Sequence, residues 1–176
     1  MAEFGAKYPC FKKNTGSTAG VVLGKLVTAN LTVNLASGEL YADDALAEQL
    51  SQFANGSLAM ETDNMADSVA SEIYGATASQ GVVTYKSSDT PPEGTLAYYK
   101  TLMVSGVRKY RAYVYPRAKA AIGNDNAQTR GSAITFQTTQ TTFTIMEDDN
   151  AVWRETKECD TETDAIAYVK QACSIT

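Results

Sequence analysis

The 176-residue chain contains no histidine. Histidine is the most common general base in enzymes and the most common side-chain ligand of transition metals. Neither a Ser-His-Asp triad nor a Cys-His pair can be assembled from these residues. Because no cofactor or metal motif stands in its place, we expect that the protein is not an enzyme and that it uses no cofactor and no metal.

Cysteine is scarce, and its three positions match no metal-binding or redox spacing: Cys10, Cys159 and Cys173. An odd number of cysteines argues against a disulfide framework, so we expect free thiols in a reducing cytoplasm. Cys159 and Cys173 would form a disulfide only if the fold brought them together.

Long apolar runs are also missing, because no run approaches the length of a membrane span. The first residues, MAEFGAKYP, lack the basic start and the apolar stretch of a signal peptide. We therefore expect no membrane insertion and no secretion by that route.

Positive charge is absent from residues 26–85, which contain eight carboxylates: Glu39, Asp43, Asp44, Glu48, Glu61, Asp63, Asp67 and Glu72. The balance reverses over 100–130, with seven basic residues and one acidic residue. Residues 147–164 are acidic again, with eight carboxylates against two basic residues. Charges segregated in this way favour pairing between segments, either within one subunit or between copies of the chain. Solvated surfaces without a partner are the alternative.

The remaining composition is typical of a folded domain, with 44% hydrophobic and 20% charged residues. We treat residues 1–176 as a single domain. Alternation of apolar and polar residues over 27–35 predicts a half-buried β-strand. Two further runs, 96–104 and 107–115, flank Ser105–Gly106, a two-residue connection that is typical of β-hairpins.

Two helices are expected. Residues 62–75 have Asp63 as a candidate N-cap, apolar residues at helical spacing, and Gly75 as a left-handed stop. Residues 160–173 have Thr161 as the cap of a closing helix. This inventory predicts a mainly β protein of the α+β class, with a β-sandwich or barrel, a flanking α-helix and a short C-terminal helix.

The pattern over residues 39–60 is ambiguous. Asp44 is placed to cap a helix that runs through Phe53, with leucines on one side. Gly38 and the pair Asn55–Gly56 are turn formers that would instead bracket extended segments. The local pattern leaves both alternatives open.

Two local motifs point to chemistry but fail on geometry. The stretch GSTAGVVLGKL resembles a phosphate-binding loop, yet its first glycine is at the wrong distance and Leu26 stands where a Ser or Thr must meet magnesium. Asp43–Asp44 and Asp148–Asp149 are adjacent carboxylates, and neighbours in an extended chain point to opposite faces. We interpret the first as the start of a strand and the other two as surface turns.

The stretch SGVRKYRAYVYPRAKAA, residues 105–121, mixes basic and aromatic residues in an acidic chain. One face can enter a core and carries Tyr110, Ala112, Val114, Pro116 and Ala118. The other face is amphipathic and carries Lys109, Arg111, Tyr113, Tyr115, Arg117 and Lys119. A net charge of −5 repels phosphate, so specific nucleic-acid binding is disfavoured. The favoured interpretation is a contact strand that faces acidic partners.

Several stretches resemble, in order and spacing, the major tail protein family of long-tailed bacteriophages and prophages: AEFGAKYPCF, GVVLGKLVTANLTVN, ELYADDALAE, SGVRKYRAYVY, TRGSAITFQT and TIMEDDNAVWRETKECDTETDAIAYV. The likeness covers nearly the whole chain. It implies a β-sandwich or barrel of the tail-tube type, assembled into rings of six that stack into a hollow tube for DNA ejection. It also implies that ELYADDALAE is extended, in a hairpin or a long loop.

The resemblance further implies several partners: further copies of the chain, a tail-tip initiator, a tape-measure protein, a tail terminator, and DNA in transient, non-specific passage. The expected location is the virion tail, assembled in the host cytoplasm. The tube of a contractile tail or of a bacteriocin particle is an alternative within the same class. A soluble β-sandwich binding module is an alternative of a different class.

The charge pattern yields a hypothesis for such a tube. An acidic bore repels DNA within about one Debye length, ~8 Å at physiological salt, and lets it slide. We expect Glu39, Asp43, Asp44 and Glu48 to face the bore or a ring interface. We expect the basic residues Lys109, Arg111, Arg117 and Lys119, with the interleaved tyrosines, to contact acidic residues of adjacent copies. Reversing Arg111 or Arg117 to Glu would then block assembly and leave the monomer folded.

Overall fold

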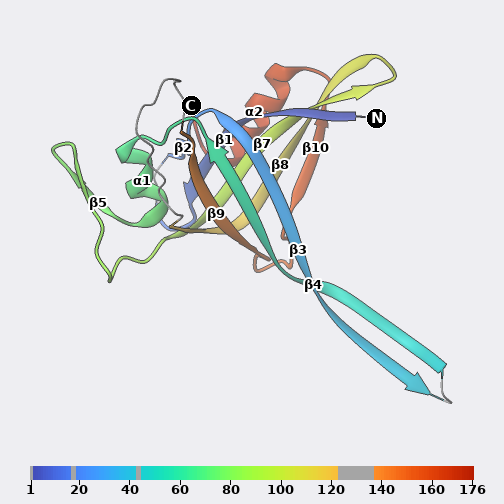
Figure 1. Cartoon of the computed structure of the whole chain (residues 1–176). Coiled ribbons are helices and arrows are strands. Elements are labelled where there is room, and N and C mark those ends of the chain that lie inside the picture. The colour runs from blue at the N-terminus through green and yellow to red at the C-terminus, as the bar shows by residue number, and fades with distance from the viewer. Residues whose placement is uncertain (1, 17–18, 43–44, 123–136) are drawn as a thin grey trace, which may run out of the picture.

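The computed structural model describes residues 2–16, 19–42, 45–122 and 137–176, and the described part of the chain is mainly β (Figure 1). The large sheet is antiparallel and has the order β2-β1-β7-β8-β9-β4-β3, with β10 added to β8. Its strands are β1 (Ala2–Lys13), β2 (Val21–Val22), β3 (Leu26–Ala42), β4 (Ala45–Thr62), β7 (Glu93–Val104), β8 (Val107–Ala121), β9 (Thr139–Met146) and β10 (Glu155–Cys159). The remaining elements are α1 (Asp67–Tyr74), α2 (Glu162–Ala172) and the small pair β5 (Thr77–Ser79) and β6 (Val82–Thr84).

Strand β8 divides the sheet into two layers. Along one edge it pairs with β7, and along the other it pairs first with β10, up to Val114, and then with β9, from Arg117. Pro116 lies where β8 changes its partner from β10 to β9, and the register of β8 against β7 also shifts there. Proline lacks a backbone N–H and is tolerated at such an irregularity in a sheet. The Pro116 carbonyl accepts hydrogen bonds from the side chains of Asn14 and Thr95.

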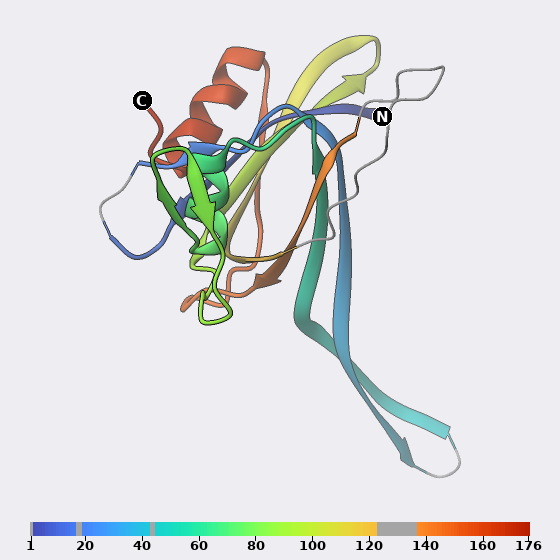
Figure 2. The ribbon, with the colours of Figure 1, turned by 60° about the vertical axis from the view of Figure 1, so that its left-hand side comes forward.

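The main core lies between the two layers. β1, β7 and β8 contribute Phe11, Leu96, Tyr98 and Tyr115 from one side, and β4 and β9 contribute Leu58, Met60, Phe143 and Ile145 from the other. Ile73 of α1 completes this cluster. Figure 2 shows α2 and β10 on one side of the body and the β3–β4 pair on the other.

A second cluster lies on the outer face of β1, β7, β8 and β10, where α2 packs; it contains Cys10, Ala97, Tyr99, Ala112, Val114, Cys159, Ala165, Val169 and Cys173. The central strands β7 and β8 are therefore buried on both faces. This corrects the expected division of β8 into one core face and one amphipathic face. Ala112 and Val114 pack beneath α2, while Tyr113 and Tyr115 belong to the main core.

The mainly β class, the closing helix and the central hairpin are confirmed. Ser105 and Gly106 have φ values of 50° and 84° at the β7–β8 turn, the positive φ at both central residues that a tight hairpin requires. Thr161 caps α2 by accepting a hydrogen bond from Asp164 N at 3.1 Å. The strand predicted over 27–35 is part of β3, although only its first half packs against the core.

Helix α1 is confirmed, but its predicted start was wrong. It begins at Asp67, with Ala66 in the cap position, and ends at Gly75 with φ 74° as expected. Asp63 instead accepts hydrogen bonds from the backbone N–H groups of Lys25 and Asn64, each at 2.8 Å. A carboxylate with two nearby donors in the preceding loop is engaged there rather than at the helix terminus.

The ambiguous segment is a β-hairpin, so the helical alternative through Phe53 was wrong. Glu39 pairs with Gln49, and Leu40 pairs with Glu48, on the way to the tip. Asn55 and Gly56 lie inside β4 rather than at a turn. Asp43 and Asp44 lie outside the described residues. Long-range pairing with β3 and β9 outweighs the weak local preferences of this segment.

Core packing between the layers gives a direct test of the fold. Phe143 is fully buried, with its ring centroid 5.9 Å from that of Phe11. We expect Phe143→Ala to lower the free energy of unfolding by about 3–5 kcal/mol in urea titrations. Phe4→Ala is the matched control, because the Phe4 side chain is largely exposed, and it should lower that free energy by about 1 kcal/mol or less. Equal losses for both variants would contradict the two-layer core.

Candidate self-assembly surfaces

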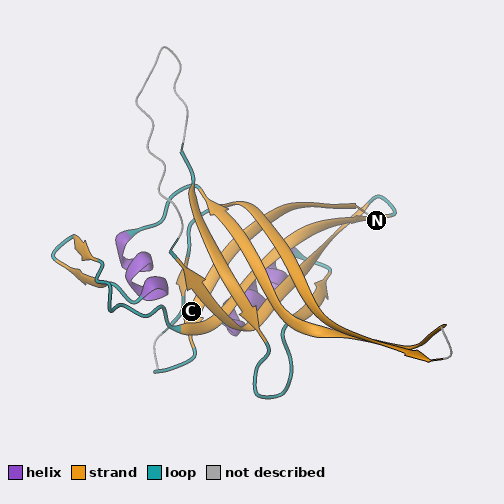
Figure 3. Cartoon of the chain, turned by 60° about the horizontal axis from the view of Figure 1, so that its bottom comes forward, coloured by secondary structure: helices purple, strands orange, loops and turns teal. Residues whose placement is uncertain are grey.

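The outer half of the β3–β4 hairpin projects from the body as an arm, which we define as residues 34–42 and 45–55. Pairing of β4 with β9 ends where Gly56 meets Ile145. Within the part of the chain that the structure describes, β3 and β4 pair beyond that point only with each other, and Figures 1 and 3 show them extending away from the body. Both edges of the arm therefore present unpaired backbone groups, which are a template for pairing with another chain.

The arm is apolar and acidic. Leu35, Leu40 and Leu50 are 60%, 58% and 61% exposed. The sequence from 34 to 55 contains four carboxylates and no Lys or Arg. Two of these carboxylates lie on the described arm: Glu39 accepts a hydrogen bond from Gln49 at 3.4 Å, and Glu48 is exposed. A two-stranded ribbon is marginally stable in water on its own. Exposed leucines on such a ribbon are characteristic of a surface that another protein covers.

The base of the arm is anchored to the body. Phe53 stacks on Trp153, with ring centroids 4.5 Å apart and an interplanar angle of 6°. The Arg154 guanidinium lies over the Trp153 ring, 4.6 Å from its centroid. Asn34 and Asn55 join the two strands through a side-chain hydrogen bond of 2.7 Å. These contacts fix the direction in which the arm leaves the body.

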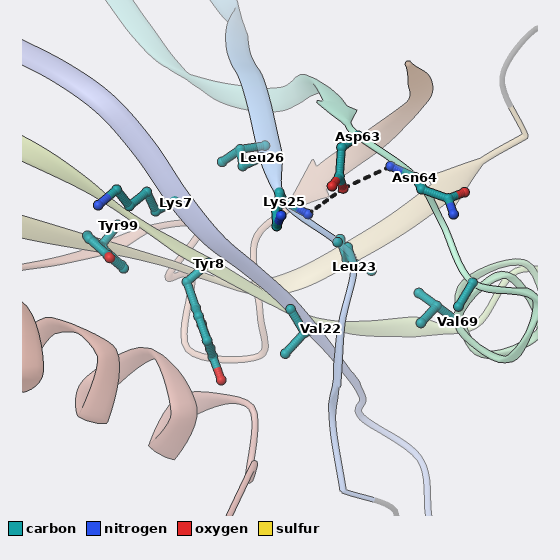
Figure 4. A pocket seen from close by; sticks show the side chains of 12 residues that line it. Lys7, Tyr8, Val22, Leu23, Lys25, Leu26, Asp63, Asn64, Val69 and Tyr99 are labelled. Atoms are coloured by element: carbon teal, nitrogen blue, oxygen red, sulfur yellow. Dashed lines mark hydrogen bonds between the residues drawn. The ribbon is translucent and has the colours of Figure 1, made fainter. Parts of the chain in front are cut away.

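An apolar groove with a volume of about 690 Å³ lies at the opposite end of the hairpin. It is lined by Lys7 and Tyr8 of β1, by the connection from Val22 to Leu26, by Asp63, Asn64 and Ala66, and by Val69 and Tyr99 (Figure 4). Leu26 pairs with Thr62 beside the groove, whereas Ala42 pairs with Ala45 at the tip of the arm. The 17 residues of β3 separate the two surfaces by roughly 50 Å.

Hydrogen bonds of the Asp63 side chain join the two connections that line the groove. Hydrogen bonds from the backbone N–H groups of Lys25 and Asn64 lower the pKa of Asp63, the Lys25 bond contributing most. Gly24 has φ 125°, and a Cβ at this position would lie 2.3 Å from the Asn64 carbonyl oxygen. Only glycine therefore permits this close approach. Lys7 and Lys25 supply positive charge at the groove, and Lys7 also pairs with Glu162 at 2.9 Å.

The basic residues predicted for β8 are engaged within the chain. Arg117 binds Glu93 through two hydrogen bonds, Nε to Oε2 at 2.8 Å and Nη2 to Oε1 at 3.2 Å. This bond raises the pKa of Arg117 and lowers that of Glu93. Lys119 lies directly opposite Glu93 in the β7–β8 register. Arg117 therefore has a carboxylate partner within its own subunit, and the expected contacts of these basic residues with adjacent copies stay a prediction.

The other basic residues of β8 join a network at the far end of the same strand. Lys109 lies 3.2 Å from Asp160 and 3.4 Å from Glu158, and hydrogen bonding to Asp160 is the main cause of the raised pKa of Lys109. Arg111 lies 3.2 Å from Glu158 and 3.3 Å from Glu3. The segregated charges of the sequence thus meet across neighbouring strands of the same chain.

Tyr113 and Tyr115 are core residues rather than contact residues, which corrects a further expectation. Both are buried, and both stack on Tyr98, with centroid distances of 5.4 Å and 6.2 Å. Burial is the main cause of the raised pKa of each phenol. Of the predicted acidic residues, the structure places Glu39 and Glu48 together on the arm, while Asp43 and Asp44 lie outside the described residues.

Sequence reasoning missed the groove and the exposed leucines of the arm. The groove has no sequence signal, because two connections and residues of β1, β7 and α1, which are distant in the sequence, build it. The arm does have a sequence signal. Residues 34–55 contain leucines and four carboxylates but no basic residue, which is unusual for a strand that packs in a core. Asp148, predicted as a turn, does form one and accepts hydrogen bonds from the N–H groups of Asn150 and Val152.

Comparisons with known proteins leave the family open: no protein-family model matches the chain, and no curated protein matches it. Among the described residues, no helix is long and apolar enough to cross a membrane. The same part of the chain contains no cluster of Cys, Asp and Glu side chains with the arrangement of a metal site.

The Arg117–Glu93 pair is tested by a charge swap. Arg117→Glu should lower the free energy of unfolding, because it replaces an ion pair by two facing carboxylates, and adding Glu93→Arg should restore most of the loss. The contribution is present above the ordinary Glu pKa of 4.5 and is lost as the pH falls through the lower pKa of folded Glu93. Urea titrations at pH 7 and in acid measure both effects. A double variant no more stable than the single variant would contradict the pairing.

Proposed function

We propose that the chain is a self-assembling structural protein, the tail tube subunit of a long-tailed phage or prophage. The observation that carries this proposal is the projecting arm, whose exposed leucines and open strand edges have no covering element among the described residues of the chain. Such an arm is stabilised when a second copy covers it. The motifs that resemble the major tail protein family support the same conclusion.

The complementary surface is the apolar groove at the base of the hairpin. Leu40 and Leu50 match its apolar lining, and the acidic residues of the arm match the positive charge of Lys25. The arm and the groove are different surfaces at opposite ends of one element. A contact between them is heterologous, so each copy leaves one free arm and one free groove, and the assembly grows as a closed ring or an open polymer.

The charge distribution supports a conduit rather than a DNA-binding protein. Lys109, Arg111 and Arg117 are neutralised by carboxylates of the same chain, which removes three candidates for phosphate contacts. Non-specific affinity for DNA rises with each phosphate that a basic residue neutralises. If six copies form a ring, six charges of −5 give −30, and DNA passes such a ring without being held.

The proposed setting follows from the family resemblance. The tube would start on a tail-tip initiator, take its length from a tape-measure protein and end at a terminator, in a virion assembled in the host cytoplasm. A contractile tail or a bacteriocin particle uses the same kind of subunit. A monomeric binding module is the competing function, because the groove is large enough for a peptide segment or a small ligand.

Negative-stain electron microscopy and sedimentation velocity over a range of concentrations test the proposal. We expect rings or hollow tubes with an open bore for the unaltered chain. The double variant Leu40→Asp, Leu50→Asp should weaken association by about a hundredfold or more, because each buried leucine contributes about 1.5–3 kcal/mol. Val82→Asp with Val107→Asp is the matched control, since both valines are similarly exposed but lie outside the arm and the groove.

Two results would overturn the proposal. One is a monomer at every concentration, even with the matching tail-tip complex added. The other is an assembly that survives the arm variant and the control variant equally well, because the arm would then make no contribution to association.

A further inference from the structure

The end of α2 meets β1 in the second core cluster, and two cysteines lie at this junction. Cys10 is in β1, and Cys173 is the C-cap residue of α2. Both side chains are fully buried. The Cys10 thiol donates a hydrogen bond to the Cys173 sulfur across a distance of 2.8 Å. The fold therefore brings together a pair of thiols from opposite ends of the sequence.

Neighbouring contacts hold this junction independently of the sulfur atoms. Gly20 N donates to the Cys173 carbonyl oxygen at 2.9 Å, and a Cβ at Gly20 would lie 2.3 Å from that oxygen. Lys12 Nζ donates to Ser174 Oγ at 2.8 Å. These bonds hold β1 and the segment before β2 against the helix end, where the two sulfur atoms are in contact.

We propose that Cys10 and Cys173 form an intramolecular disulfide when the protein meets an oxidising environment. The bond ties the first strand of the sheet to the last helix. The sequence allowed a bond between Cys159 and Cys173 only if the fold brought them together, and the sulfur in contact with Cys173 belongs to Cys10 instead. Cys159 ends β10 and remains a single buried thiol in the same cluster.

The reaction is a thiol–disulfide exchange with a small disulfide such as oxidised glutathione. Cys173, as a thiolate, attacks one glutathione sulfur, forms a mixed disulfide and releases one glutathione thiolate. The Cys10 sulfur then attacks the Cys173 sulfur and releases the second glutathione. The two cysteines lose two protons and two electrons in total, and the small disulfide takes up both to become two thiols.

Burial makes this reaction slow in the folded protein. The hydrogen bond to Cys173 is the main cause of the raised pKa of Cys10, and burial adds to it, so the Cys10 thiolate that completes the exchange is scarce. Fraying of the last turn of α2 exposes Cys173, because helix ends open more readily than helix centres. The thiols therefore stay reduced through folding and assembly in a reducing cytoplasm and are linked afterwards.

A bond between residues 163 positions apart closes almost the longest loop that this sequence permits. Long loops lose the most freedom in the unfolded chain when they are closed, so the linked form is the more stable one. The bond itself does not depend on the proposed function. Only the time of oxidation rests on the proposed function, because a released particle passes from a reducing cytoplasm into an oxidising medium.

The test is refolding in a mixture of reduced and oxidised glutathione, followed by peptide mapping with mass spectrometry. We expect one dominant product that is two hydrogens lighter than the reduced chain, with Cys10 linked to Cys173 and Cys159 free. At a fixed urea concentration in the transition region, oxidation should lower the ratio of unfolded to folded protein by roughly thirtyfold or more.

Two variants separate the bond from the effect of a cavity. Cys173→Ala should show no change in stability on oxidation. Cys159→Ala also removes a buried thiol of the same cluster, but it should show the full increase in stability on oxidation. A product that links Cys159, or glutathione-capped or free thiols at equilibrium, would overturn the proposal. These results are independent of whether tubes form, so failure of the disulfide and failure of the proposed function are distinguishable.

Discussion

The division of one edge of β8 between two partners is the constraint on which the rest of the structure depends. Because β10 pairs as far as Val114 and β9 pairs from Arg117, the strand serves both layers. The layer with β1 and β7 is covered by α2 on its outer face and by the second layer on its inner face. The other layer carries β4, which continues past the end of β9 at Gly56 and so produces the projecting arm.

The same division explains which expectations from the sequence succeeded. Alternation over 27–35, the Ser105–Gly106 turn and the Thr161 cap are local signals, and each predicted its element correctly. The faces of β8 were assigned wrongly, because an alternating strand was assumed to have one buried face. In the stretch of β8 from Ala112 to Tyr115 every residue is apolar or aromatic and buried, so the pattern there contains no information on which layer each residue faces.

The candidate site was predictable only in part. The acidic segment with Glu39 and Glu48 was identified from charge alone, and the structure places both residues on the arm. The roles of Arg111 and Arg117 could not be predicted, because the sequence does not show which carboxylates become cross-strand neighbours. Arg111 pairs with Glu158 and Arg117 pairs with Glu93 within the same chain. The groove depends on close approach of Gly24 to Asn64, a contact set by tertiary packing.

The basic and the acidic segments of the sequence have different surroundings in the structure. The basic residues of β8 pair with carboxylates of the same chain, whereas the acidic arm carries exposed apolar side chains. We propose that the acidic hairpin serves association. The contact inferred between the arm and the groove is the central claim, because it makes the assembly directional and lets it grow. It also explains why a stable body carries a long two-stranded extension that buries little of its own surface.

The most direct test is carbodiimide cross-linking of a mixture of unlabelled and heavy-nitrogen-labelled copies, because this reagent joins only carboxylates and amines in contact. The account predicts peptides of mixed label in which Glu39 or Glu48 of one copy is joined to Lys25 or Lys7 of another. Arm carboxylates joined to other lysines, or linked peptides that never mix the labels, would contradict it.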